Sequence, residues 1–440
     1  MPSYALSRLE TKGGKKKMTE FLQTLSDVFS TFGATVFVPI ILFIIGMCMG
    51  APAKKAFQSA LLCAVGLTGF NFVVNSYSAI IAPVVNQMVT NAGVNLPGLD
   101  TGWQSVSVIA YSTKVGVLFI GVAIVLQIVL FLAKWTDVFM ASDLWNNYSF
   151  MVWGSLIYAL TENMLLAMAC MVVQLLYILL FSEACAKRWS TYYEYDNCCM
   201  TAPHHLESLP FAVIMNWLLG KIGFNKIKLN AETLQKKLGL LGEPMFIGLI
   251  VGAVLAVLAG QSVPQVIASA LNIAAVLLLL PKMVSLLMEG LSTIAQYTQT
   301  WAQNMKFLKG KDLYIGIDGG ILMGRPSVIV VGVIMIPIML ALAAIVPGNR
   351  VLPIADLAVL TSWFCWCPVA AKDNIFRGIV SAIIQGVIIL LIATAMTGIH
   401  DVMAVQSGYV YAEGITHTSA LVMGQELLPD LLYKIFSFFG

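Results

Sequence analysis

Long apolar stretches, separated by short polar turns, dominate the pattern of positions along the 440-residue chain. A helix that crosses the hydrocarbon core of a bilayer needs about 20 apolar residues. Stretches suited to this role lie at 31–50, 57–86, 112–133, 149–184, 242–260, 265–289, 327–346, 351–371, 377–398 and 418–437. The stretch at 149–184 has room for a tilted helix and a further segment, and 203–220 for a short helix or a re-entrant piece. The pattern predicts an all-α polytopic membrane protein with about ten or eleven transmembrane helices.

Composition and charge agree with this fold class. Hydrophobic residues make up 59% of the chain, charged residues make up 11%, and the mean hydropathy is +0.86. A soluble domain of this length would expose large apolar patches with such a composition. The basic residues gather in a tail that ends at Lys15-Lys16-Lys17 and in a loop at 221–237, so both are expected on the cytoplasmic side. Nothing in this distribution indicates a nucleic-acid partner.

The eight cysteines lie mostly within apolar runs and lack the spacing of a metal site. No metal and no cofactor is therefore expected.

An internal repeat is visible in the order of short matching segments. The pairs are Gly33–Val38 with Gly242–Ile247, Ser59-Ala60-Leu61 with Ser269-Ala270-Leu271, and Leu99-Asp100-Thr101-Gly102 with Ile317-Asp318-Gly319-Gly320. We expect a tail at 1–17, a first membrane repeat at 18–190, a connecting segment at 191–240, a second repeat at 241–400 and a C-terminal segment at 401–440. Two such halves with irregular segments are typical of inverted-repeat transporters, whose substrate site lies near the middle of the membrane.

Asp318 is the first candidate for a substrate site. It stands between Gly316 and the pair Gly319-Gly320, in a chain built for lipid. A charged side chain at the centre of a spanning helix costs roughly 2.5–3.5 kcal/mol on insertion scales, so it usually faces a polar cavity or a partner. The glycines favour a broken backbone, which is tolerated at membrane depth only inside the protein or along a cavity. An acid in a loop beside a helix end is the alternative interpretation.

A polar patch at Asp100, Trp103 and Gln104 precedes the stretch at 112–133. An aromatic face packs on the C–H face of a polyol, and amide and carboxylate groups bind its hydroxyls. The patch therefore suits a sugar or polyol, although a tryptophan at the membrane interface beside a helix start would have the same pattern.

His204 and His205 are two of only four histidines in the chain. Adjacent helix positions point in different directions, so the two rings would not hold one metal ion. Either a neutral imidazole binds a substrate hydroxyl, or the pair belongs to a loop at the membrane surface. Glu243, before Pro244, is a further acid, for which a place at a helix N-terminus is a sufficient explanation.

The chain resembles the membrane (EIIC) component of galactitol-type phosphotransferase systems, within the ascorbate/galactitol superfamily, from about Phe32 to His400. The matching pieces are Asp100-Thr101-Gly102-Trp103, Trp145-Asn146, Pro203-His204, Gly242-Glu243-Pro244, Gly316-Ile317-Asp318, Val346-Pro347-Gly348-Asn349 with Leu352-Pro353, and Asn374-Ile375-Phe376-Arg377.

This resemblance implies a homodimer in the bacterial cytoplasmic membrane, with a scaffold domain and a core domain that carries substrate like an elevator. Such systems take up a polyol or sugar and couple uptake to phosphorylation by a partner EIIB, which is charged through EIIA and carries the donor cysteine. Whether this chain itself counts as an enzyme stays open. The acid at the position of Asp318 is implied to hold and deprotonate the accepting hydroxyl, and the histidine at His204 to contact substrate. Further candidates for substrate binding are Asp100, Trp103, Gln104, Gly319, His205 and Glu243.

The sequence departs from the family pattern near these candidates. Family members often have proline at the position of Gly319, histidine at Arg325, glycine at His205 and proline at Gln104, and Lys372-Asp373 is unusual before Asn374. Two rival hypotheses are an ion-coupled secondary transporter, in which Asp318 and Asp100 would bind protons or sodium, and a membrane sensor that binds the same ligand.

Overall fold

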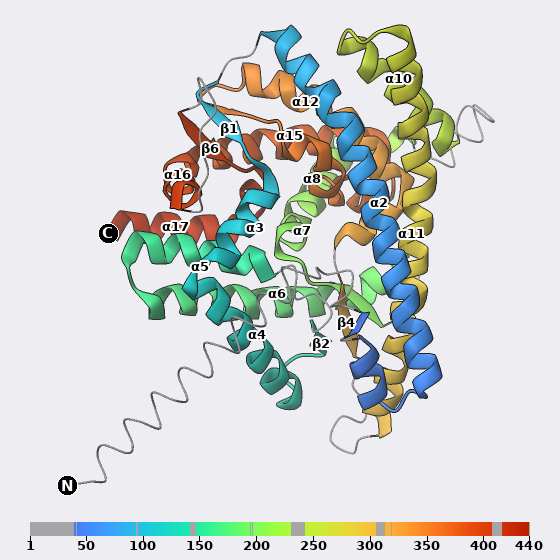
Figure 1. Ribbon diagram of the computed structural model, residues 1–440, viewed down its shortest axis with the longest axis vertical. Helices are drawn as coiled ribbons and strands as arrows, with labels where there is room; N and C mark the ends of the chain where they lie inside the picture. Colours follow the sequence, from blue (N-terminus) through green and yellow to red (C-terminus); the bar gives the residue numbers. More distant parts are fainter. Residues whose placement is uncertain are drawn as a thin grey trace.

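The computed structural model describes residues 39–40, 42–93, 96–140, 147–193, 195, 197–229, 243–304, 313–317, 319–406 and 416–439. Helices form nearly all of the regular structure (Figure 1). Within these residues, five helices are long and apolar enough to cross a membrane: Lys114–Leu132, Met164–Thr191, Val263–Thr298, Pro326–Ile345 and Ile375–Ala395. The predicted class, a helical multi-pass membrane protein, is confirmed.

The longer helices follow one another along the chain with few irregular connections. They are α2 (Ala53–Ala92), α3 (Gly102–Ser112), α4 (Lys114–Leu132), α5 (Asn147–Thr161), α6 (Met164–Tyr193), α8 (Leu209–Lys221), α10 (Pro244–Leu258), α11 (Val263–Asn304), α12 (Pro326–Ile345), α15 (Ile375–Ala395), α16 (Thr397–Gln406) and α17 (Leu427–Phe439). The short ones are α7 (Pro203–Leu206), α13 (Leu360–Trp363), α14 (Trp366–Ala370) and the 3₁₀ turns η1 (Phe224–Lys226), η3 (Gly319–Gly324), η4 (Asp356–Val359) and η5 (Leu421–Gln425).

The predicted crossings at 351–371 and 418–437 are not single helices, which corrects the prediction for both. The first divides into strand β5 (Val351–Leu352), η4, α13 and α14, and the second into β6 (His417–Ser419), η5 and α17. Pro353 and Pro368 lie in the first segment, and proline removes a helical hydrogen bond. The stretch at 149–184 is likewise two helices, α5 and α6, separated by a turn in which Glu162 has φ 52°. The breaks in the first two segments place irregular backbone inside the protein, whereas the turn at Glu162 is exposed.

The long helices α2 and α11 run side by side along one edge of the molecule, in blue and yellow in Figure 1. Glycine permits their close approach. A Cβ atom at Gly290 would lie 2.5 Å from the carbonyl oxygen of Ser59, and Gly66 lies directly against the backbone of Leu287. Small residues at helix contacts let backbones approach in membrane proteins, because packing must replace the hydrophobic driving force there.

Two short parallel sheets have the same construction, with strands exchanged between the two halves of the chain. In sheet A, strand β1 (Gly98–Asp100) lies between β5 and β6; in sheet B, strand β4 (Tyr314–Ile317) lies between β2 (Val138–Phe139) and β3 (Cys198–Met200). Each central strand comes from one half and its neighbours from the other. Strands β3 and β6 lie outside the predicted repeats at 18–190 and 241–400, so the repeat, its boundaries and the division into scaffold and elevator domains stay predictions.

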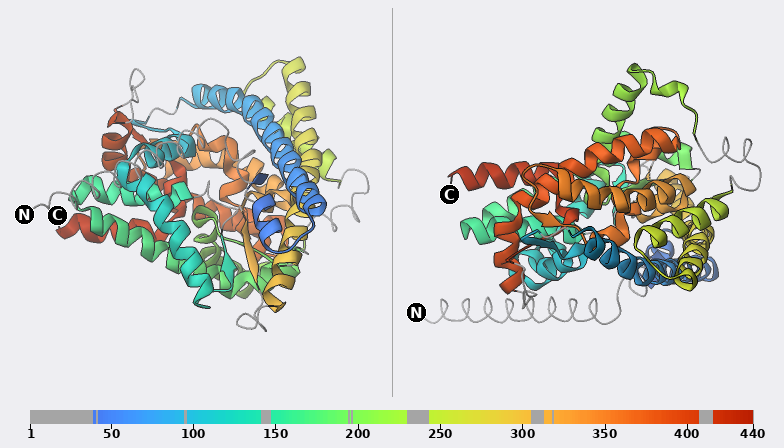
Figure 2. Two further views of the ribbon diagram at one scale, coloured as in Figure 1. Left: turned by 60° about the horizontal axis from the view of Figure 1, so that its bottom comes forward. Right: turned by 90° about the horizontal axis from the view of Figure 1, so that it is seen from above.

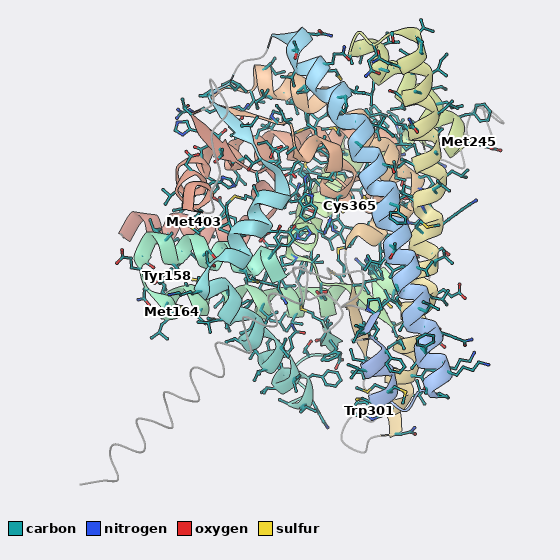
Figure 3. The ribbon with its side chains drawn as sticks, in the orientation of Figure 1. Tyr158, Met164, Met245, Trp301, Cys365 and Met403 are labelled. Carbon is teal, nitrogen blue, oxygen red and sulfur yellow. The ribbon has the colours of Figure 1, made fainter. Side chains whose placement is uncertain are left out.

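Helices α5, α7 and α13 meet in the interior of the protein. Cys365, which follows α13, is fully buried and lies inside the molecule in Figure 3, whereas Met245, at the start of α10, is 36% exposed and lies at its edge. In contrast, α8 projects from the body of the protein beside α15 (Figure 2). Of the candidate side chains, the interior junction brings together those of His204, His205 and Trp103.

Candidate functional site

His204 lies at the centre of this junction. Strand β3 ends at Met200, and Pro203 starts the short helix α7, which turns His204 into the interior. Its Nδ1 lies 2.6 Å from the hydroxyl oxygen of Ser149, and its ring stacks on Tyr148 at 5.3 Å between centroids. Burial, and to a smaller extent the neighbouring His205, holds the pKa of His204 well below its ordinary value, so the imidazole is neutral.

His205 points to different partners, as expected for adjacent helix positions. Its Nε2 lies 2.5 Å from the hydroxyl oxygen of Ser362, and its carbonyl accepts a hydrogen bond from the indole of Trp366 at 2.9 Å. Both histidines are only 3% exposed. This burial does not fit a loop pair at the surface, whereas the predicted contact of an imidazole with a substrate hydroxyl stays a prediction.

Aromatic rings surround His204. Trp363 meets the His204 ring edge-on at 5.7 Å, and Trp103 lies 6.2 Å from the Tyr148 ring on its far side. Trp103 therefore reaches the same junction from α3, and its part in substrate binding stays a prediction. Gln104 is the next residue of α3, but its side chain is outside the described part of the structure.

Two polar groups on the helices that meet at this junction are buried without a hydrogen-bond partner within the described part of the chain. They are the side-chain amide of Asn147, both its nitrogen and its oxygen, and the indole nitrogen of Trp363. Asn147 is 1% exposed and immediately precedes Tyr148 and Ser149. A buried polar group left unpaired costs about 1–3 kcal/mol, so such groups often mark the place of a ligand.

Asp100 occupies a different place, at the end of β1 in sheet A. One carboxylate oxygen accepts backbone N–H bonds from Gly102 at 3.1 Å and Leu421 at 3.2 Å, and the other accepts from Ile354 at 3.2 Å and Asp356 at 2.8 Å. These bonds join the turn after β1, the segment at 354–356 before and in η4, and the start of η5. Its prediction as a substrate ligand stays a prediction, but its described bonds are all to the backbone.

Asp356 lies next to Asp100, to which it donates its backbone N–H, and its own carboxylate also binds backbone groups. Its carboxylate accepts backbone N–H bonds from Trp103 at 2.9 Å and Val422 at 3.0 Å. Burial raises the pKa of both acids, and Asp100 also raises that of Asp356.

Asp318 lies outside the described residues. The chain on both sides of it is held against the elements that surround His204. Before it, Ile317 is in register with Met200 of β3; after it, Gly319 begins η3, and within η3 the sulfur of Met323 accepts the Thr361 hydroxyl at 3.2 Å. Thr361 belongs to α13, the helix that carries Trp363.

Glu243 stands at the N-terminus of α10, before Pro244, where the sequence suggested it. Its side chain makes no capping hydrogen bond, and its carbonyl accepts the N–H of Ile247 at 3.0 Å. No described contact brings Glu243 to His204, so its role in substrate binding stays a prediction.

Two departures from the family pattern meet in space. Arg325 donates to the carboxylate of Asp373 at 2.9 Å, and the Ser327 hydroxyl donates to the same carboxylate at 2.6 Å. Lys372 and Asp373 both have positive φ, 56° and 60°, in the turn before α15. The guanidinium of Arg325 also lies over the Tyr193 ring at 4.7 Å. The two unusual positions thus form one ion pair at the edge of sheet B.

Sequence reasoning did not find several residues of this junction. They are Asn147, Tyr148, Ser149, Ser362 and Trp363, and Asp356 of the Asp100 cluster was missed as well. The matching piece Trp145-Asn146 indicated the start of α5. The residues of α13 were not found, because 351–371 was predicted to be a single transmembrane helix.

The five helices that are long and apolar enough to cross a membrane, together with the buried polar junction among the described residues, define a multi-pass membrane protein with a polar interior. The family model described as "PTS system sugar-specific permease component" matches residues 27–415, so the chain belongs to this EIIC family of phosphotransferase-system permeases.

Similar proteins come from Escherichia coli. The chain is 30% identical over 408 residues to the "PTS system galactitol-specific EIIC component" of strain K12, covering 92% of this chain and 89% of that protein. It is 29% identical over 399 residues to a "Putative permease IIC component" of the same strain, covering 90% and 91%. The predicted family is confirmed.

Proposed function

We propose that this permease takes up a galactitol-like polyol or sugar and that uptake is coupled to phosphorylation of the substrate by a partner EIIB. The observation that carries the proposal is the pair of buried polar groups, without a described hydrogen-bond partner, on the helices that meet at His204. The amide of Asn147 and the indole N–H of Trp363 offer both acceptor and donor positions, as hydroxyl groups require. The rings of Tyr148, Trp103 and Trp363 supply faces for the C–H side of a carbon chain.

Asp318 is the proposed acceptor of the proton from the reacting hydroxyl. The hydroxyl oxygen forms a bond to phosphorus, the sulfur–phosphorus bond of the EIIB phosphocysteine breaks, and the hydroxyl proton moves to the Asp318 carboxylate. Family membership, and the position of Asp318 between β4 and η3, support this assignment. His204 is the proposed substrate contact, in a homodimer in the bacterial cytoplasmic membrane that works with EIIB and EIIA.

Uptake of labelled polyol into membrane vesicles tests the proposal. Phosphorylated substrate should accumulate only when EIIA, EIIB and phosphoenolpyruvate are supplied. Accumulation of unmodified substrate under a proton or sodium gradient, without EIIB, would instead establish the ion-coupled alternative. A thermal-shift screen against hexitols, pentitols and hexoses would identify the substrate, because a ligand that binds the folded protein raises its stability.

A further inference from the structure

A chain of side-chain amides beside the junction ends in a nitrogen that has no acceptor. Gln385 of α15 donates from its side-chain nitrogen to the carbonyl of Trp363 at 3.3 Å and to the side-chain oxygen of Gln425 at 2.8 Å. The oxygen of the Gln385 amide accepts the thiol of Cys367 at 3.1 Å. Gln425, the last residue of η5, is 1% exposed, and its side-chain nitrogen has no hydrogen-bond partner within the described part of the chain.

The carbonyl of Trp363 fixes the orientation of both amides. A backbone carbonyl only accepts hydrogen bonds, so the group of Gln385 that faces it is the NH₂ group. The same nitrogen faces the side chain of Gln425, which must therefore present its oxygen. Rotation of either amide by 180° would place two acceptors or two donors against each other. The end of Gln425 that lacks a partner is thus its nitrogen, which has two hydrogens to donate.

The hydrogen bonds from Gln385 place this nitrogen among the elements that surround His204. Gln425 and the backbone of Trp363 are bound by one nitrogen atom, and the Trp363 ring meets the His204 ring edge-on at 5.7 Å. Besides α15, η5 also contacts α3 and α7, the helices that carry Trp103 and His204. The amide of Gln425 therefore lies at the junction already described, on the side of η5.

The indole N–H of Trp363 is a second buried donor without a described partner. A buried donor without an acceptor is costly, because it has lost its hydrogen bonds to water and gained none in exchange. An indole nitrogen and an amide nitrogen can only donate, so neither group can satisfy the other. Two such donors, on segments that Gln385 joins, indicate an acceptor oxygen that the described part of the chain does not supply. The hydroxyl oxygen of a polyol has two lone pairs and suits this role.

We propose that the side-chain nitrogen of Gln425 is a further substrate-binding group, which donates a hydrogen bond to one hydroxyl oxygen of the bound polyol. The hydrogen bond from Gln385 keeps the amide in the orientation that this contact needs. A site built to bind a hydroxyl group discriminates against the analogue that lacks it, because the buried donor is then left unpaired again. This inference rests on the proposed function for the class of ligand, but not for the transfer of phosphate.

Calorimetry on the purified full-length protein in detergent, without EIIB, tests the contact. The probes are galactitol and its 1-deoxy, 2-deoxy and 3-deoxy analogues, each as both enantiomers, which remove the hydroxyl groups of galactitol one at a time. Gln425→Met replaces the amide by an apolar side chain of similar length. We expect it to weaken galactitol binding about tenfold, the equivalent of one hydrogen bond. At least one deoxy analogue should bind Gln425→Met and the wild type equally, because the hydroxyl that Gln425 contacts is already absent from it.

Gln127→Met is the matched control. Gln127 lies on α4, is 5% exposed, and accepts the backbone N–H of Met140 with its side-chain oxygen at 3.2 Å. This variant should bind galactitol and all of the analogues like the wild type. Should Gln425→Met not fold, Gln425→Asn is the second variant. It keeps an amide in the interior but withdraws the nitrogen by one methylene group, so the same pattern of affinities is expected.

Unchanged galactitol binding in the Gln425 variants would overturn the inference. So would an equal loss of affinity for galactitol and for every deoxy analogue, because that result would mean a general effect on packing. Phosphorylated product in the vesicle experiment, with either of these results, would leave the proposed function standing. Conversely, the expected affinities together with uptake of unmodified substrate under an ion gradient would reject the proposed function and leave Gln425 as a binding residue.

Discussion

The two short sheets have the same strand arrangement, but the polar side chains near them have different hydrogen-bond partners. After β6 of sheet A, the chain continues as the apolar turn η5, and the side-chain acids Asp100 and Asp356 bind backbone N–H groups. After β3 of sheet B, the chain continues as α7, which carries His204 and His205 with side-chain partners. The comparison teaches that the acids near sheet A join irregular segments through backbone hydrogen bonds, whereas the histidines after sheet B have polar side-chain partners in the buried junction.

Removal of the carboxylate of Asp100 should break sheet A and give the largest effect. Asp100→Ala leaves four backbone N–H groups without their acceptor, each worth about 1–3 kcal/mol. We expect loss of folded protein from the membrane, measured by size-exclusion chromatography in detergent. A folded Asp100→Ala variant that only binds substrate more weakly would instead support the role of Asp100 as a ligand.

Removal of the charge of Asp318 should leave the fold intact and stop the chemistry. Asp318→Asn should reduce phosphoryl transfer from phosphorylated EIIB by about 10²- to 10⁴-fold, the usual contribution of a general base. The rate is measured with purified protein at matched amounts of folded material. A wild-type rate in this variant would remove Asp318 from the mechanism.

The effect of His204→Ala can be compared with that of a variant of His400, a buried histidine of α16 that contacts sheet A. His204 is predicted to contact the substrate, so its loss should weaken binding by roughly tenfold, the equivalent of about one hydrogen bond. His400 is also buried and lies 3.0 Å from the hydroxyl of Thr418 in β6. His400→Gln should leave the dissociation constant, measured by calorimetry, unchanged. Equal losses in both variants would mean a general effect of packing.

The ion pair at the edge of sheet B should have the smallest effect. Arg325 and Asp373 are 28% and 24% exposed, and ion pairs of this kind contribute about 0–1 kcal/mol. Asp373→Asn should therefore lower the thermal unfolding midpoint by only a few degrees, and less at high salt. A loss of uptake at unchanged stability would give the pair a direct part in transport.

Sequence reasoning located part of the buried junction but not its surroundings. His204 and Trp103 were predicted from their chemistry, and both lie in the junction around Tyr148. The sequence did not indicate Trp363, because 351–371 has the apolar composition of a transmembrane helix. Only the tertiary structure shows that this segment divides into shorter elements. For Asp100, the residue type suggested a polyol ligand, but the tertiary structure surrounds its carboxylate with backbone N–H donors.

The sequence by itself determined that the protein is a multi-pass helical membrane protein of the EIIC type, because apolar length and motif order are local properties of the chain. It also indicated the repeat. Only the tertiary structure decided which segments meet, since the strands of each sheet come from both halves of the chain. The same packing brings the backbone N–H of Trp103 to the carboxylate of Asp356, 253 residues away in the chain. Contacts over such distances depend on packing that no local pattern encodes.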